Sequence, residues 1–389
     1  MRNATAATLA SVATAALLAG CSTTVTGTAT GISGAVGHGP GASAAIPSGL
    51  QTGNYPTTPR TIPANSSNSA WVAEGNRMGD ALIQVNEVDP RMTIGGAALR
   101  SFPVLRGMQL SERVPDDTAS AFSSASMRVG MTTTRGDRLE NPTVAVRIGL
   151  YRFGTDADAK KAVDSIKSDS AGKRQIPIAS APGGIATEFK PGTVDSYLAR
   201  GPIVINVSGT GPTTAAATGF VDKAFKLEIP KLDSFKPTPA AEVSGLPADE
   251  DGIMSRTLPY DSTEDPNPEL SQGYLSYTGL LHRIQDISTA DRYQRAGVDL
   301  VGQAGSVVYR TRDAGAAKDF AKGFYSSDKY SPASVPKQPA MRCARETSAS
   351  SSYVCVVVVQ RYVATVLADS LPDAQKKAAA QWVILTKAG

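Results

Sequence analysis

The feature that most restricts the possible folds of this chain is a short stretch that occurs twice. Residues 150–159 read Leu-Tyr-Arg-Phe-Gly-Thr-Asp-Ala-Asp-Ala, and residues 308–317 read Val-Tyr-Arg-Thr-Arg-Asp-Ala-Gly-Ala-Ala. In each copy an apolar strand leads into Tyr-Arg, and a Thr or Asp that is suited to capping then opens an Ala-rich helix. The repeat predicts an internal duplication. A chance alignment of two α+β halves is the alternative.

The order of predicted elements also repeats. The first half has a strand, a helix, a strand pair and a helix, at 144–150, 157–167, 193–199 with 203–208, and from Thr213 or Thr214. The second half has the same order, at 306–310, from Asp313, at 352–359 with 362–367, and from Pro372. A helix precedes each half, at 69–85 and at 274–286. We therefore expect an α+β fold of two similar domains, with antiparallel sheets that helices cover mainly on one face.

Two segments show no regular pattern. Residues 91–141 are rich in Ser, Thr, Gly and Arg and are expected to be irregular. Residues 229–270 carry seven prolines and are expected to form a strap between the halves. Because ligand sites often lie at domain interfaces, we expect a functional cleft between the halves, lined partly by 91–141.

The amino terminus resembles a bacterial lipoprotein signal. Arg2 precedes a short apolar run at 6–18, which is too short to span a bilayer permanently. Leu18-Ala19-Gly20-Cys21 then matches the lipobox, in which cleavage precedes a cysteine that receives lipid. An ordinary signal peptide with a chance cysteine is the alternative. Lipidation of Cys21 would anchor the chain stably, because two or three acyl chains each add about 0.8 kcal/mol per buried CH₂.

The domain boundaries follow from composition. Residues 1–20 form the signal peptide, and residues 21–50 form a flexible tether of Gly, Ser, Thr and Ala that contains His38. We expect an N-terminal α+β domain at 51–239 and a C-terminal α+β domain at 240–389.

The remaining cysteines are typical of an exported protein. With Cys21 lipidated, Cys343 and Cys355 form one leftover pair, on two predicted strands joined by a small polar loop. We expect a disulfide with Cα atoms within about 7 Å. A zinc site is the alternative, but it lacks the two further ligands that zinc prefers.

Charge and hydropathy exclude several partner classes. In the mature chain of 369 residues, Lys plus Arg exceeds Asp plus Glu by three (38 minus 35). No basic run of five or more residues occurs, which argues against nucleic acid as a partner. No later run of 18 apolar residues occurs either, so the lipid is the only predicted membrane attachment.

Candidates for catalysis are few. His282 is the single histidine outside the tether, and Asp286 would lie one turn away on a helix and orient its imidazole. No Gly-x-Ser-x-Gly motif supplies a nucleophile. A capped or surface histidine is the competing interpretation.

Other binding motifs are incomplete. Gly209 to Thr214 lies where phosphate can bind at a helix start, but it lacks the P-loop lysine. The acidic residues Asp249, Glu250 and Asp251 lack the spacing of a calcium loop and are expected to form a solvated turn. We expect no cofactor, no metal and no catalytic residue.

Several motifs resemble a known family. They are Gly53-Asn54-Tyr55-Pro56-Thr57, Glu74-x-x-Arg77-Met78 and Val88-Asp89-Pro90, downstream of the lipobox and tether. Together they resemble actinobacterial envelope lipoproteins of unknown function, found in mycobacteria, nocardiae and rhodococci, over roughly residues 51–389. The resemblance implies no catalytic residues.

The sequence therefore predicts a lipoprotein on the extracytoplasmic face of the cell membrane. The expected function is a non-enzymatic module that binds an envelope lipid or protein ligand. The alternative is an envelope hydrolase that uses His282 or paired carboxylates.

Overall fold

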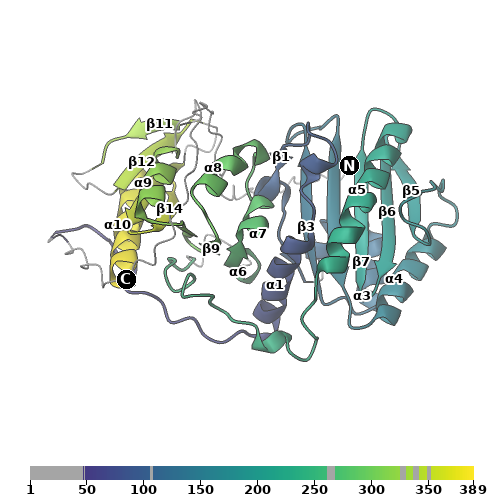
Figure 1. Cartoon of the computed structure of the whole chain (residues 1–389), viewed down its shortest axis with the longest axis horizontal. Helices are drawn as coiled ribbons and strands as arrows, with labels where there is room; N and C mark the ends of the chain where they lie inside the picture. Colours follow the sequence, from purple (N-terminus) through teal and green to yellow (C-terminus); the bar gives the residue numbers. More distant parts are fainter. Residues whose placement is uncertain are drawn as a thin grey trace, which may run out of the picture.

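The computed structural model describes residue 47 and residues 49–105, 108–260, 268–324, 330–335, 341–347 and 352–389. The predicted lipobox with Cys21 and the tether residue His38 lie outside the described residues. Figure 1 shows two halves side by side, the N-terminal half in blue to teal and the C-terminal half in green to yellow.

The N-terminal half is built on a seven-stranded antiparallel sheet. Its order is β1-β3-β4-β7-β6-β5, and β2 also pairs with β3. The strands are β1 (Ile94–Gly95), β2 (Pro103–Val104), β3 (Val129–Gly136), β4 (Ala145–Arg152), β5 (Ile185–Lys190), β6 (Thr193–Arg200) and β7 (Ile203–Thr210).

The C-terminal half has its own seven-stranded antiparallel sheet, in the order β11-β12-β13-β14-β10-β9-β8. The strands are β8 (Gly273–Ser276), β9 (Leu300–Gln303), β10 (Val307–Arg310), β11 (Tyr330–Ala333), β12 (Met341–Glu346), β13 (Tyr353–Val359) and β14 (Tyr362–Ala368). The predicted strand pairs are confirmed as β6 with β7 and β13 with β14.

The two halves share one topology. In each, a hairpin is followed by a helix, a meander and a final helix, and the last strand of the meander pairs with the second strand of the hairpin. The meander has three strands in the N-terminal half and four in the C-terminal half, where β11 is the extra strand. Thus β3-β4-α4-β5-β6-β7-α5 corresponds to β9-β10-α9-β12-β13-β14-α10. The α+β class and the two similar domains with antiparallel sheets are therefore confirmed.

Helices lie on both faces of each sheet rather than mainly on one. In the N-terminal half, α5 (Thr214–Ser234) covers one face, and α3 (Asp116–Ser124) and α4 (Asp156–Asp169) cover the other. In the C-terminal half, α10 (Leu371–Lys387) covers one face, and α8 (Ala290–Arg295) and α9 (Ala314–Lys322) cover the other. Both faces need a covering layer because the strands carry apolar side chains on both sides. On β4, Ile148 and Leu150 enter the core under α5, whereas Tyr151 faces the core on the other side of the sheet.

The helix that precedes each half is shorter than expected. The first, α1 (Ser67–Met78), is followed by short 3₁₀ turns at Gly79–Ala81 and Val85–Glu87. The second splits into β8, α7 (Tyr277–Leu281) and a 3₁₀ turn at Ile287–Thr289. The two long helices predicted from apolar spacing were wrong. The apolar residues of these segments are buried against several neighbouring elements, and not along one face of a single helix.

The segment 91–141 is not irregular. It contains β1, a 3₁₀ turn (Gly96–Leu99), β2, α2 (Met108–Ser111), α3 and the whole of β3. Sequence prediction missed β3 because it is a central strand buried on both faces, with three consecutive threonines in place of alternation.

The strap between the halves begins later than expected, because α5 extends through Pro230 to Ser234. It contains a 3₁₀ turn (Val243–Gly245) and reaches α6 (Pro268–Ser271). Among the described residues, no helix has the length and hydropathy to cross a membrane.

The segment that follows the tether packs on the C-terminal half before it reaches α1. Leu50, Tyr55 and Ile62 contact the core under α10, and the Tyr55 hydroxyl donates to the Asp373 carboxylate at 2.8 Å. Figure 1 shows this segment running below the C-terminal half to α1. Any anchor ahead of residue 50 therefore joins the fold beside α10.

The halves are joined by backbone hydrogen bonds. Gly95 N donates to Gln285 O at 2.7 Å, and Ile287 N donates to Thr93 O at 3.0 Å. Gly96 has a φ of 65°, and a Cβ there would lie 2.1 Å from Ile284 O. Only glycine allows this close approach.

Candidate functional site

His282 lies in the junction between the halves, not in an open cleft. Its ring is fully buried, with Nε2 3.1 Å from the Gln84 amide nitrogen and Nδ1 3.1 Å from the Thr133 hydroxyl. Burial, and then the charge of Arg135, lower its pKa to about 3, so the imidazole is neutral. Since α7 ends at Leu281, Asp286 does not orient the ring and instead caps the following turn by accepting from Ser288 N.

The expected cleft at the junction is filled by buried arginines. Arg135 is fully buried and donates to the carbonyls of Thr93, Leu281, Ile284 and Gln285. Burial lowers its pKa to about 10. Around Arg135 the junction is packed rather than open, because this one side chain fills the space between carbonyls of the two halves.

The Glu-x-x-Arg motif forms a second buried cluster. The Glu74 carboxylate is fully buried and accepts from Arg152 of β4, from Arg77 at 2.6 Å and from Thr238 N at 2.9 Å. Spacing of three residues places Glu74 and Arg77 on one face of α1. The cluster joins α1, β4 and the start of the strap, so its role is structural.

A third cluster lies on the sheet face that α3 and α4 cover. Arg147 of β4 is 3.5 Å from Asp195 of β6, and Asn206 of β7 donates to Asp195 at 3.0 Å. The Tyr197 hydroxyl donates to the same carboxylate and accepts from Thr118 of α3 at 3.2 Å. We call Arg147, Asp195, Tyr197 and Asn206 the sheet cluster. The Arg147 side chain is 25% exposed, so the cluster reaches solvent there.

Tyr151 and Arg113 lie beside these four residues, and we include both in the sheet cluster from here on. The Tyr151 ring lies flat over Gly149, where a Cβ would be 2.9 Å from the hydroxyl oxygen, and so points back along β4 toward Arg147. Within the described part of the chain, this fully buried hydroxyl has no hydrogen-bond partner, and neither do Nε and Nη1 of Arg113 or Nε of Arg147. Burial raises the pKa of Tyr151 to about 12 and lowers that of Arg113 to about 10.

The C-terminal half has no such cluster at the corresponding positions. In the N-terminal half, Gly149 of β4 pairs with Asn206 of β7, which pairs with Tyr197 of β6. In the C-terminal half, Val307 of β10 pairs with Thr365 of β14, which pairs with Val356 of β13. With Leu150 aligned to Val308, the counterparts of Arg147, Asp195, Tyr197 and Asn206 are Gly305, Val354, Val356 and Thr365. The shared topology therefore does not require the charges of the sheet cluster.

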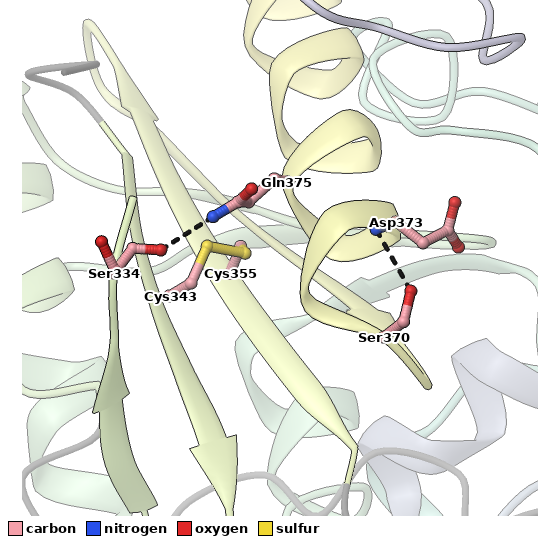
Figure 2. Close-up of a disulfide and its surroundings, with 6 residues drawn as sticks. All are labelled: Ser334, Cys343, Cys355, Ser370, Asp373 and Gln375. Carbon is pink, nitrogen blue, oxygen red and sulfur yellow. Dashed lines mark hydrogen bonds between the residues drawn. A yellow bond between two sulfur atoms is a disulfide. The ribbon is translucent and has the colours of Figure 1, made fainter. Parts of the chain in front are cut away.

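The opposite face of each sheet shows another difference between the halves. Cys343 and Cys355 are directly paired across β12 and β13 and form a disulfide with a Cα–Cα distance of 4.0 Å, as the sequence predicts (Figure 2). Their N-terminal counterparts, Ala186 and Ser196, line a hollow of about 360 Å³ beside Phe225. Its described lining carries no charged side chain.

The incomplete binding motifs have structural roles. Thr213 caps α5 by accepting from Ala216 N at 3.2 Å, so Gly209 to Thr214 is the end of β7 and a short turn into a capped helix. Asp249 accepts from Met254 N and Ser255 N, and Asp251 accepts from Arg310 at 2.7 Å. Among the described residues, no group of three or more His, Cys, Asp or Glu side chains is placed to hold a metal ion.

Sequence reasoning missed the sheet cluster. The available signal was the alternation of Thr193, Asp195 and Tyr197 with Val194 and Leu198, which gives β6 one polar and one apolar face. Asn206 in an otherwise apolar strand was a second signal. Neither signal identifies Arg147 as a partner, because that depends on β4 pairing with β7.

Two family models match the chain. They are the N-terminal part of a domain of unknown function (DUF7373), over residues 62–248, and its C-terminal part, over residues 253–388. No curated protein matches. Among solved structures, the extracellular domain of PknH from Mycobacterium tuberculosis matches with a TM-score of 0.28 and 11% identity, over 39% of this chain and 93% of that chain.

Proposed function

We propose that this chain, which belongs to the family defined by the DUF7373 domains, is an exported, lipid-anchored module that binds a ligand in the cell envelope. The sheet cluster is the observation that carries the proposal. It is a polar, partly exposed site in the N-terminal half, and the corresponding described positions of the C-terminal half carry no charged side chain.

A physical argument links the cluster to binding. Burying charged and polar groups costs free energy, and replacing a buried ion pair with apolar residues is often neutral or stabilising. The C-terminal half has Val354 and Val356 at the positions of Asp195 and Tyr197. A cluster that the fold does not need is better explained by a ligand than by stability.

The anchor is proposed from the sequence. The lipobox ending at Cys21 supports lipidation, and the motifs around Tyr55, Glu74 and Val88 resemble those of actinobacterial envelope lipoproteins. The disulfide Cys343–Cys355 fits an oxidising compartment. Metabolic labelling with an alkynyl fatty acid should label the wild-type chain and not Cys21→Ala. Label that persists in the variant would contradict the anchor.

Binding is tested on protein purified from its own envelope. Native mass spectrometry should find an additional bound mass on the wild-type chain, and less of it on the double variant Arg147→Leu, Asp195→Val. A bound mass that is equal on both chains would contradict the sheet cluster as the site.

The hydrolase alternative gains no support from the surroundings of His282. A general base must reach the proton that it removes, but this ring is buried and contacts Gln84 and Thr133. With a pKa of about 3 it also stays neutral, far from the value that suits a base at neutral pH.

A further inference from the structure

The sheet cluster contains more hydrogen-bond donors than the protein itself satisfies. Across the described residues, the Tyr151 hydroxyl, Nε and Nη1 of Arg113 and Nε of Arg147 are buried without a hydrogen-bond partner. Leaving a buried donor unpaired costs free energy, so such groups in native proteins call for a bound partner. Four donor atoms from three residues of one neighbourhood indicate a shared partner.

The charge of this neighbourhood favours an anion. Burial is the main reason why the pKa values of Arg113 and Arg283 are lowered, and a neighbouring positive charge adds to the effect in each case, that of Arg147 on Arg113 and that of Arg113 on Arg283. The facing carboxylates are already engaged. Asp195 is bound by Asn206 and Tyr197, and Glu112 is paired with the exposed Arg100 and lies 3.6 Å from Arg113 Nη1.

The geometry also gives access. The Arg147 side chain is 25% exposed and that of Arg113 is 10% exposed, so both arginines reach the protein surface in part. Tyr151 forms the inner wall, because its ring is held flat over Gly149 and Gly130, where a Cβ would lie 2.5 Å from the ring. Both glycines are therefore needed to aim the hydroxyl at the cluster.

We infer that the sheet cluster recognises an oxyanion, a phosphate or carboxylate group of the ligand, through Arg147, Arg113 and the Tyr151 hydroxyl. This inference rests on the proposed binding function and names the chemical class of the ligand. Guanidinium groups match phosphate and carboxylate oxygens in geometry and charge, and a neutral phenol adds a donor that costs no proton. Asp195 and Asn206 act as positioning residues that hold Arg147 over the sheet.

The decisive variant is Tyr151→Phe, because the hydroxyl that it removes bonds to no other described group and the packing of the ring is preserved. The matched control is Tyr293→Phe in the C-terminal half. Its hydroxyl is also buried without a hydrogen bond, beside nitrogens of Arg292 that are likewise buried without one, and that guanidinium stacks on Phe324 at 4.3 Å. The control therefore separates loss of a buried tyrosine hydroxyl as such from loss of the hydroxyl beside Arg147. Arg113→Leu is a second variant that removes the charge.

The experiment is calorimetric titration of the full chain, in neutral detergent, with inorganic phosphate, sn-glycerol 3-phosphate and acetate. We expect saturable binding of at least one probe, weakened about tenfold by Tyr151→Phe and more by Arg113→Leu, but unchanged by Tyr293→Phe. Tighter binding of glycerol phosphate than of phosphate would assign the oxyanion to a headgroup-like ligand, and the reverse order to a free phosphate. Preference for acetate would assign it to a carboxylate.

Two results would overturn the inference. One is no saturable binding of any probe by the wild-type chain, and the other is an equal loss in Tyr151→Phe and Tyr293→Phe. A failure of this inference can be distinguished from a failure of the proposed binding function. An envelope-derived ligand that native mass spectrometry finds on the sheet cluster, but that has neither phosphate nor carboxylate, would leave the function standing and remove the oxyanion.

Discussion

The two halves carry the same Tyr-Arg pair at the end of the same strand, yet the two arginines have opposite surroundings. Arg152 is 5% exposed and bound by the fully buried Glu74, whereas Arg310 binds Asp299 and Asp251, which are 58% and 62% exposed. The tyrosines keep one role, since Tyr151 and Tyr309 are both fully buried in aromatic clusters. Duplication thus preserved the packing residue and let the charged residue take different partners.

The largest difference between the halves is expected from removing the buried carboxylate. Glu74→Ala leaves Arg152 buried without its charge partner, so the free energy of unfolding should fall by about 3–5 kcal/mol. The matched variant Asp299→Ala should lower it by less than about 1 kcal/mol, because the Asp299 carboxylate is 58% exposed and Asp251 still binds Arg310. Urea unfolding curves measure both. Equal losses would mean that the two arginines are energetically alike.

The disulfide should give the next largest effect, confined to the C-terminal half. Replacing both Cys343 and Cys355 with Ala should lower the free energy of unfolding by about 3 kcal/mol, because the bridge closes a short loop in the unfolded chain. Reducing the wild-type chain is the control and should give the same midpoint. A variant as stable as the oxidised protein would show that the bridge adds nothing to this half.

The buried carboxyl of α5 should make the N-terminal half sensitive to pH. Glu228 is fully buried, and Leu385 occupies the equivalent position in α10, since both lie 15 residues after their N-caps (213 to 228 and 370 to 385). Burial raises the pKa of Glu228 to about 8. Between the unfolded value, about 4.3, and pH 8 the unfolded chain loses this proton while the folded chain keeps it, so stability falls as pH rises.

The variant Glu228→Gln removes that titration and can still accept from Ile83 N. Its stability relative to the wild type should rise between pH 5 and pH 8, by on the order of 2 kcal/mol. The control is Glu242→Gln, at an exposed carboxylate, which should follow the wild type at each pH. Thermal unfolding across this range measures the effect, and a difference that does not depend on pH would refute the assignment.

The smallest effect on stability is expected at the sheet cluster. Arg147→Leu combined with Asp195→Val should leave the free energy of unfolding within about 1 kcal/mol of the wild type, or raise it. Arg147→Leu alone should cost more, since it leaves the buried Asp195 without its cation. Denaturant unfolding of the single and double variants separates these outcomes. A large loss in the double variant would make the cluster structural and weaken the comparison with the C-terminal half.

Local pattern was enough to predict much of the repeat. The strand pairs β6–β7 and β13–β14 are close in sequence and joined by short turns, so their antiparallel pairing follows from chain length. Helix starts were visible because Thr155, Thr213 and Asp313 accept hydrogen bonds from the first turn. The bond between Cys343 and Cys355 followed from their being the leftover pair on neighbouring strands.

The sites could not be predicted in the same way. The expected contact between His282 and Asp286 was wrong because the helix ends at Leu281, and the segment that follows turns into the junction, where His282 is buried. The strand β3 was missed because burial on both faces removes the alternation that identifies a strand. The boundaries proposed at residues 50 and 239 remain predictions.

By itself, the sequence determined what depends on near neighbours along the chain: the repeated order of elements, the helix caps and the cysteine pair. Only the tertiary structure decided which side chains share a site. Arg147, Asp195 and Asn206 meet because β4, β7 and β6 are paired in one register, and a slip of one residue would turn each to the other face. That register depends on the packing of both sheet faces, and no local stretch of sequence encodes it.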